Sequence, residues 1–253
     1  DKILIADNDT LYQKNYASER IIKILKGPSD TQVALTIFRK SKNETLKIDL
    51  KRGKVPLRSV ESYYMLADNI GYIKINRFSQ TTYEEFESAI KSLMASGMTK
   101  MILDLRDNPG GYLSAAREIS DTFLDKDQTI VITQTNKGKE ERSFATGSGI
   151  FKEGSLVVLT NGQSASASEI VAGAIQDNDR GWVVGRRTFG KGLVQQQMPL
   201  GGGDAIRLTI ARYFTPTGRS IQKPYGRDHE AYYNDLNQRI ENGEMADENK
   251  VPI

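Results

Sequence analysis

The chain has 253 residues, 38% of them hydrophobic, which is enough for one large or two smaller domains with a real core. Its 35 basic and 32 acidic residues are interspersed and leave a net charge of only +3, which argues against nucleic acid or an anionic membrane surface as a partner. The absence of cysteine excludes disulfides and thiolate metal sites, and with one histidine we expect no metal and no cofactor.

Neither a membrane span nor an export signal is expected in the chain as given, because it has no run of 18 apolar residues and no charged-then-apolar N-terminus. Its first residues already follow a strand pattern, as a fragment of a longer precursor would.

Residues 1–57 have the pattern of a small α+β module. A strand is predicted at 3–6 and a helix at 16–26, which the pair Gly27-Pro28 ends. Apolar residues then alternate over 33–37 and 46–50, which predicts a hairpin.

A second domain is predicted over 58–224, after a linker strand at 55–60. Strands at 70–75 and 101–105 alternate with helices at 81–96 and 113–124. Such repeated strand–helix units indicate an α/β domain.

The turn Asn108-Pro109-Gly110-Gly111 enters the second of these helices. Its two glycines are expected to leave backbone N–H groups bare, as binding of an oxyanion requires. A tight turn that needs glycine for its geometry alone is the alternative.

Residues 155–197 contain the densest group of candidate site residues. A buried strand at 156–160 leads to a helix entry with three serines at 164–169, and a second buried strand is predicted at 182–184. A glycine-rich turn at 188–192 then places Lys191 between two glycines, ahead of a strand at 193–197. The remaining 225–253 form a polar, partly helical extension.

Two motifs carry a family resemblance. Ser-Ala-Ser-Ala-Ser-Glu at 164–169, followed by Thr-Phe-Gly-Lys-Gly-x-Val-Gln at 188–195, resembles the tail-specific, C-terminal processing serine peptidases. The resemblance implies Ser166 as nucleophile, Lys191 as general base and Gln195 as the residue that orients the base.

The same resemblance implies an oxyanion hole formed by Gly110, Gly111 and the backbone N–H of Ala167. It also implies a ClpP/crotonase-like layered catalytic domain at 58–224 and a partial PDZ-like module at 1–57, whose helix would form one wall of a peptide groove.

The chemistry of the residues supports a lysine base independently, because a serine hydroxyl needs a base and the single histidine, His229, lies in a polar stretch. A lysine acts as a base only when its amine is neutral, and apolar neighbours favour the neutral form by lowering its pKa. Phe189, Val194 and the strand of Trp182 are the expected neighbours, and the carboxylates Glu169 and Asp177 are expected to stay away from Lys191.

The predicted function is therefore a serine endopeptidase that cleaves proteins near an accessible C-terminal tail. By family likeness the setting is a bacterial periplasm or cell envelope, with the export signal outside this sequence. The oligomeric state, and an adaptor or regulator, are left open.

Two alternatives remain. The first is a catalytically silent peptide-binding module on the same fold. The second is a nucleotide-binding protein, because the loop at 185–192 matches seven positions of a phosphate-binding loop, although Gly192 lacks the hydroxyl needed for a nucleotide-bound metal. Ser-x-x-Lys, typical of β-lactamases, occurs at 88–91 and 220–223 without its companion motifs, and we interpret both matches as chance.

Overall fold

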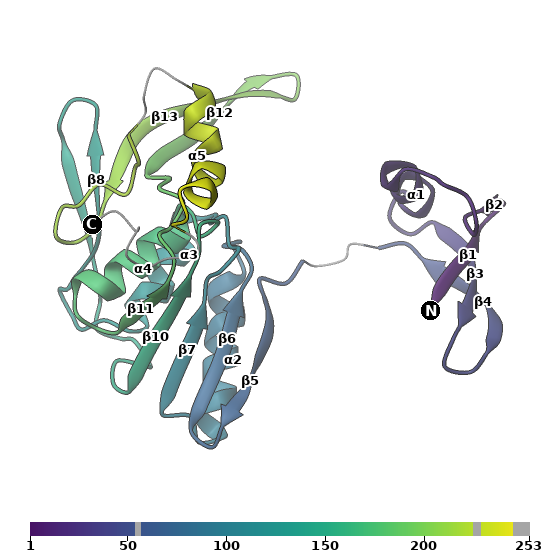
Figure 1. The fold of residues 1–253 in the computed structure, drawn as a ribbon, viewed down its shortest axis with the longest axis horizontal. Helices are drawn as coiled ribbons and strands as arrows, with labels where there is room; N and C mark the ends of the chain where they lie inside the picture. The colour runs from purple at the N-terminus through teal and green to yellow at the C-terminus, as the bar shows by residue number, and fades with distance from the viewer. Residues whose placement is uncertain (54–56, 225–228, 245–253) are drawn as a thin grey trace. The chain divides into compact units, whose positions relative to one another are not determined.

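The computed structural model describes residues 1–53, 57–224 and 229–244, and it divides the chain into two compact units, Asp1–Leu57 and Arg58–Ile253 (Figure 1). Each unit is described by itself. Residues 55 and 56 of the predicted linker strand at 55–60 lie outside the described residues, 57–59 form no strand, and Val60 begins β5.

The first unit is one antiparallel sheet with a short helix. Strand order in the sheet is β2-β1-β3-β4, and β3 and β4 form the predicted hairpin. The elements are β1 (Lys2–Ala6), β2 (Asp9–Thr10), α1 (Ser18–Leu25), β3 (Gln32–Arg39) and β4 (Glu44–Lys51). The small core of Ala6, Val33, Leu35 and Ile37 is extended by partly buried residues of α1 and β4. Its PDZ-like character stays a prediction.

The second unit is built on a five-stranded sheet of order β11-β10-β7-β6-β5. Four strands run parallel, and β5 joins the edge antiparallel to β6. The strands are β5 (Val60–Ala67), β6 (Ile70–Ile75), β7 (Lys100–Asp104), β10 (Ser155–Thr160) and β11 (Trp182–Gly185). The edge strand β5 was not predicted.

Three helices cover one face of this sheet, and a second sheet packs beyond them (Figure 1). The helices are α2 (Thr82–Ala95), α3 (Leu113–Asp121) and α4 (Ala167–Asp177). The second sheet has the order β12-β13-β8-β9, and its strands are β8 (Thr129–Thr135), β9 (Glu140–Phe144), β12 (Leu193–Gly201) and β13 (Asp204–Phe214). β8 contacts both α3 and α4. The unit therefore has the predicted layered α/β architecture.

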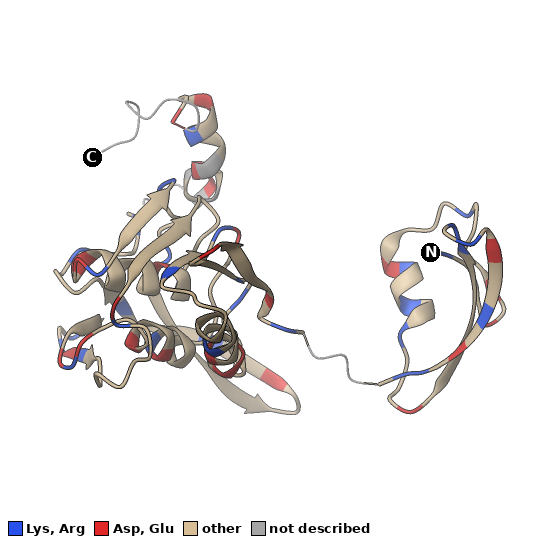
Figure 2. Ribbon diagram, turned by 90° about the horizontal axis from the view of Figure 1, so that it is seen from below, with Lys and Arg blue, Asp and Glu red and all other residues tan. Residues whose placement is uncertain are grey.

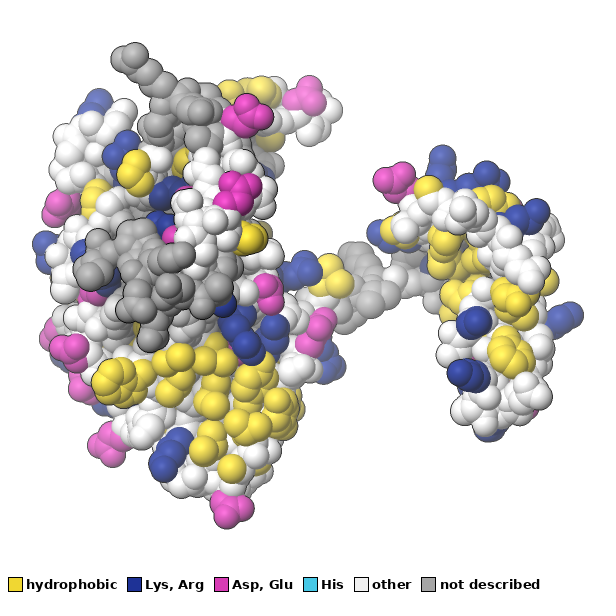
Figure 3. All heavy atoms as spheres, viewed as in Figure 1, with side chains coloured by type: hydrophobic (Ala, Val, Ile, Leu, Met, Phe, Trp, Pro, Cys, Tyr) yellow, Lys and Arg dark blue, Asp and Glu magenta, His cyan; other side chains and the backbone are white. Residues whose placement is uncertain are grey.

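Burial alternates along β6 and β10, where every second residue is buried against the helices and the others are partly covered or exposed. The prediction of a buried strand at 182–184 is wrong, because β11 lies at the edge of the sheet and none of its residues is buried. Trp182, on the edge strand β11, is 76% exposed. Hydrophobic side chains consequently gather on one visible face of this unit (Figure 3). The alternation follows because helices cover only one side of the sheet.

The core between the layers fixes the ends of the strands that carry the site. Its largest buried side chains come mainly from β6, β7, α2, α3 and the turn after α3, and they include Ile73, Ile75, Phe86, Ile90, Leu103, Ile119 and Phe123. A last helix, α5 (His229–Glu241), follows β13. Among the described residues, no helix combines the length and apolar character that crossing a bilayer requires. Basic and acidic residues are scattered over both units (Figure 2).

Candidate active site

Ser166 lies at the turn between β10 and α4, directly before the first helical residue. Its backbone has φ +55° and ψ −112°, an uncommon conformation for any residue except glycine. Backbone strain of this kind costs about 1–3 kcal/mol and persists where surrounding contacts enforce it, often at active sites.

The three serines of the motif have different surroundings. Ser164 is buried and its Oγ donates to the carbonyl oxygen of Leu105 at 2.7 Å. Ser168 is also buried, and its Oγ donates to the carbonyl oxygen of Asn108 at 3.0 Å. Ser166 is partly exposed, and its side chain accepts from the Glu169 backbone N–H in a capping box. No hydrogen bond in which Ser166 Oγ donates is found among the described residues. Two serines therefore join the helix start to β7 and the glycine turn, and the middle hydroxyl keeps its proton available for a base.

Asn108 holds the glycine turn in place. Its fully buried side chain donates from Nδ2 to the carbonyl oxygen of Ile75 at 2.8 Å and accepts from the Gly110 N–H at 2.9 Å. The backbone oxygen of Asn108 also accepts from the Ala165 N–H at 3.0 Å. These contacts fix the turn against the start of α4. The sequence does not indicate this role of Asn108, because an Asn-Pro pair signals only a turn.

The prediction that both glycine N–H groups are bare is wrong for Gly110, whose N–H is occupied by Asn108. What its position requires is close approach: a Cβ on Gly110 would lie 2.7 Å from Ser166 Cβ and 2.8 Å from Ala167 N. The backbone N–H groups of Gly111 and Ala167 donate to no acceptor in the described part of the chain. These two remain candidate oxyanion donors.

Glu169 joins the serine turn to the lysine loop, defined here as residues 187–192. Its carboxylate accepts from the backbone N–H groups of Ser166 at 2.8 Å, Gly190 at 2.6 Å and Lys191 at 2.8 Å, and from the Thr188 hydroxyl at 2.7 Å. Burial raises the pKa of Glu169, and the four donors oppose that rise by favouring the carboxylate.

Glu169 therefore contacts the backbone of Lys191, and the expectation that it stays away from that residue is wrong in this respect. The same carboxylate oxygen lies 2.8 Å from Ser166 N and 2.8 Å from Lys191 N. Because both nitrogens lie 2.8 Å from this one oxygen, they are no more than twice 2.8 Å, or 5.6 Å, apart.

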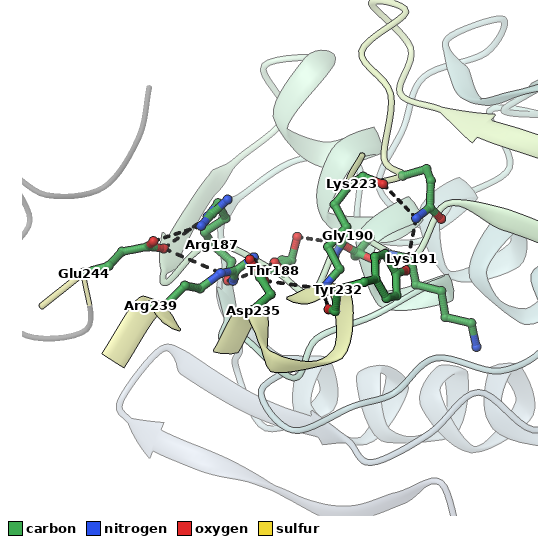
Figure 4. A network of polar contacts seen from close by, with 11 residues as sticks. Arg187, Thr188, Gly190, Lys191, Lys223, Tyr232, Asp235, Arg239 and Glu244 are labelled. Atoms are coloured by element: carbon green, nitrogen blue, oxygen red, sulfur yellow. Dashed lines mark hydrogen bonds and ion pairs between the residues drawn. The ribbon is translucent and has the colours of Figure 1, made fainter. Parts of the chain in front are cut away.

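The side chains of the predicted dyad are not joined. No hydrogen bond within the described residues connects Ser166 Oγ to Lys191 Nζ, or Lys191 to Gln195, which is exposed on β12. Figure 4 shows the Lys191 side chain extending away from the polar contacts around its loop.

Two of the apolar side chains that were predicted to surround Lys191 have other surroundings. Trp182 is exposed on the edge strand. Phe189 packs edge-on against Tyr232 at 6.4 Å between ring centroids, and Lys223 Nζ lies 4.4 Å from the centre of its ring. The Phe189 ring therefore packs against Tyr232 and Lys223.

A further charged group lies at the end of β7, just before the glycine turn. Asp104 is fully buried and accepts from Tyr72 Oη at 2.6 Å and from Arg106 Nη2 at 2.6 Å. Burial pushes the pKa of Asp104 upward, but these hydrogen bonds outweigh it, so the pKa lies below its ordinary value. Burial and the carboxylate raise the pKa of Tyr72 to about 12.

The remaining candidates are placed as follows. Residues after the lysine loop form β12, where a phosphate-binding loop requires a helix. The polar stretch at 225–228 and the side chain of His229 lie outside the described residues. Among the described residues no three acidic, histidine or cysteine side chains gather as metal ligands.

Comparison with known proteins gives one consistent family. The model of peptidase family S41 matches residues 69–230. A carboxy-terminal-processing protease of Bartonella bacilliformis is 40% identical over 203 residues, which cover 78% of this chain and 46% of that protein. A Staphylococcus haemolyticus protein named "Probable CtpA-like serine protease" is 39% identical, over 80% of this chain and 40% of its own length. The chain thus spans about half the length of these relatives.

A solved structure agrees with the fold. The photosystem II D1 C-terminal processing protease superimposes with a TM-score of 0.60 at 30% identity, over 87% of this chain and 60% of that chain.

Proposed function

Since the chain belongs to peptidase family S41, we propose that it carries the catalytic centre of a serine endopeptidase that cuts proteins near their C-terminus. The observation that carries the proposal is the contrast among the three serines. The hydroxyls of Ser164 and Ser168 are buried and donate to backbone carbonyls, whereas Ser166 lies on a strained turn beside the glycine turn and the lysine loop, and its hydroxyl donates to no described group.

In the proposed reaction the neutral amine of Lys191 takes the proton of the Ser166 hydroxyl as Oγ attacks the peptide carbonyl. The backbone N–H groups of Gly111 and Ala167 bind the oxyanion that forms, and one such donor typically lowers the barrier by about 2.7–4 kcal/mol. Lys191 returns the proton to the leaving amine as the C–N bond breaks and an acyl-enzyme remains. A water molecule, deprotonated by Lys191, then hydrolyses the ester and frees Ser166.

The dyad requires the Lys191 side chain to turn toward Ser166. The short separation of their backbone nitrogens supports such a rotation, because only the side chain has to move. Catalytic hydrogen bonds are often absent before substrate binds. In this proposal Gln195, four residues further along β12, orients the amine once it has turned.

The proposed substrate is a protein with an accessible C-terminal tail, and the proposed setting is the bacterial cell envelope. The bacterial relatives and the names they carry support both statements. The first unit, with α1 beside its sheet, is proposed as part of a PDZ-like module that receives such a tail by strand addition.

Cleavage of a denatured protein by the full-length protein tests the proposal. Ser166→Ala and Lys191→Ala are expected to lower kcat/KM by at least about a thousandfold. Ser88→Ala and Lys91→Ala, the Ser-x-x-Lys pair on α2, are the matched controls and should retain wild-type activity. Undiminished cleavage by Ser166→Ala would contradict the proposal, and tail binding without any cleavage by the wild type would favour the silent binding module.

A further inference from the structure

The lysine loop is held mainly by polar contacts. Glu169 binds it on the side of α4, and a cavity of about 530 Å³ lies between the loop, α4 and residues 215–224. Because close packing does not fill this space, core side chains alone do not determine where the loop sits. Contacts from other directions therefore matter for the position of Lys191.

Arg239 of α5 provides two such contacts. Its side chain is almost fully buried, and Nη1 donates to the carbonyl oxygens of Arg187 and Thr188, each at 3.1 Å (Figure 4). Both carbonyls belong to the lysine loop, three and four residues before Lys191. A planar guanidinium suits such a pair of acceptors, because its N–H groups point in fixed directions.

Acidic partners hold the guanidinium of Arg239. Asp235, one turn earlier on α5, lies 2.8 Å from Nη2, and Glu244 lies 3.9 Å from Nε, which has no hydrogen-bond partner within the described residues. Glu244 in turn accepts two hydrogen bonds from the Arg187 side chain, at 2.9 and 3.1 Å. The C-terminal segment thus binds both the backbone and a side chain of the lysine loop.

A second group of contacts connects α5 to the far end of the loop. The backbone N–H of Lys223 donates to the carbonyl oxygen of Gly190 at 3.0 Å, and Gln222 Oε1 accepts from the Gly192 N–H at 3.0 Å. Lys223 Nζ donates to the carbonyl oxygen of Tyr232 on α5 at 2.8 Å. Carbonyls and N–H groups on both sides of Lys191 are therefore held from the C-terminal side.

We propose that Arg239 is a positioning residue for the peptidase reaction: by holding the Arg187 and Thr188 carbonyls, it fixes the lysine loop so that Lys191 can reach Ser166. This inference rests on the proposed function. Buried ion networks contribute little net stability. The main consequence of the network of Arg239, Asp235 and Glu244 is therefore the geometry that it imposes on the lysine loop. Arg239 lies beyond residues 69–230, so the matched family region depends on a segment outside it.

The test compares Arg239→Met with Arg142→Met, which removes an exposed guanidinium on β9, in the full-length protein. A fluorophosphonate probe measures two quantities, the fraction of Ser166 that is finally labelled and the rate of labelling per reactive site. For Arg239→Met we expect nearly complete labelling at a rate about 10- to 100-fold lower, since a displacement of about 1 Å can cost a hundredfold. The value of kcat should fall with it and KM should change little. Arg142→Met should match the wild type.

A structural role predicts the opposite pattern, in which fewer sites react but each reacts at the wild-type rate, and that result overturns the proposal. If Arg239→Met does not fold, Arg239→Lys replaces it, because lysine keeps the charge beside Asp235 but cannot hold both carbonyls in one plane. A wild-type rate in that variant also overturns the inference. Absence of Ser166 labelling in the wild type would instead contradict the proposed function, so the two failures are distinguishable.

Discussion

Gly110→Ala tests whether the glycine turn must approach the nucleophile closely. The added Cβ would lie 2.6 Å from the carbonyl oxygen of Ala165, 2.7 Å from Ser166 Cβ and 2.8 Å from Ala167 N, whereas ordinary contact begins at 3.4 Å. Relief of these overlaps requires displacements of roughly 0.6–0.8 Å at the serine turn, and a displacement of about 1 Å can cost a hundredfold in rate. We therefore expect kcat/KM to fall by about 50- to 100-fold.

Gly97→Ala is the matched control. Gly97 follows α2 and has the same φ of +93°, but its Cβ would meet nothing within 4 Å. Both variants should lose about 1–2 kcal/mol of unfolding free energy from the left-handed conformation. Urea unfolding measures that loss, and hydrolysis of a denatured protein measures kcat/KM. If Gly110→Ala is as active as Gly97→Ala, close approach is not needed and the reasoning is refuted.

Three other predictions follow from the buried polar groups. Glu169→Gln places an amide N–H₂ group against buried N–H donors, so it should cost about 1–3 kcal/mol of unfolding free energy and lower kcat/KM roughly a hundredfold. The exposed Glu141→Gln is the control and should change neither quantity. Equal activity of the two variants would contradict the role of Glu169 in joining the serine turn to the lysine loop. Ser168→Ala should lose about 1 kcal/mol in urea unfolding and keep its activity within about tenfold, and loss of all cleavage would cast doubt on Ser166 as nucleophile. The difference between the ultraviolet titration curves of the wild type and Tyr72→Phe should give the Tyr72 phenol a pKa of about 12. The stability that its hydrogen bond to Asp104 contributes is therefore present below pH about 10 and lost as the pH rises toward 12. Ionisation of Tyr72 near pH 10 would exclude that hydrogen bond.

Local patterns predicted most of the second unit. Apolar runs bounded by glycine or proline placed β7, β10 and α2 within one or two residues, because these signals depend on neighbouring residues alone. The strands β5 and β9 were missed because exposed tyrosines, leucine and charged residues obscure their alternation. Strand β11 was predicted as buried since apolar composition does not reveal which strand forms an edge.

The site was only partly predictable. The spacing of Ser166 and Glu169 is that of a capping box, which indicates the bond between them. Glu169 also binds the backbone N–H of Lys191, which lies 22 residues later in the chain. That contact depends on how the chain folds back from β11 and β12 onto α4, and no local sequence pattern predicts it. Arg239 gave no signal either, because an arginine on a polar helix is usually solvated. Its burial arises only when α5 packs against the lysine loop.

The most direct test of the account identifies the residue that reacts. The full-length protein and its Lys191→Ala variant are treated with a fluorophosphonate, digested and mapped by mass spectrometry. The account predicts a single adduct on Ser166 in the wild type and labelling at least about a hundredfold slower in the variant. An adduct on another serine, or equally fast labelling without the Lys191 amine, would contradict the proposed dyad.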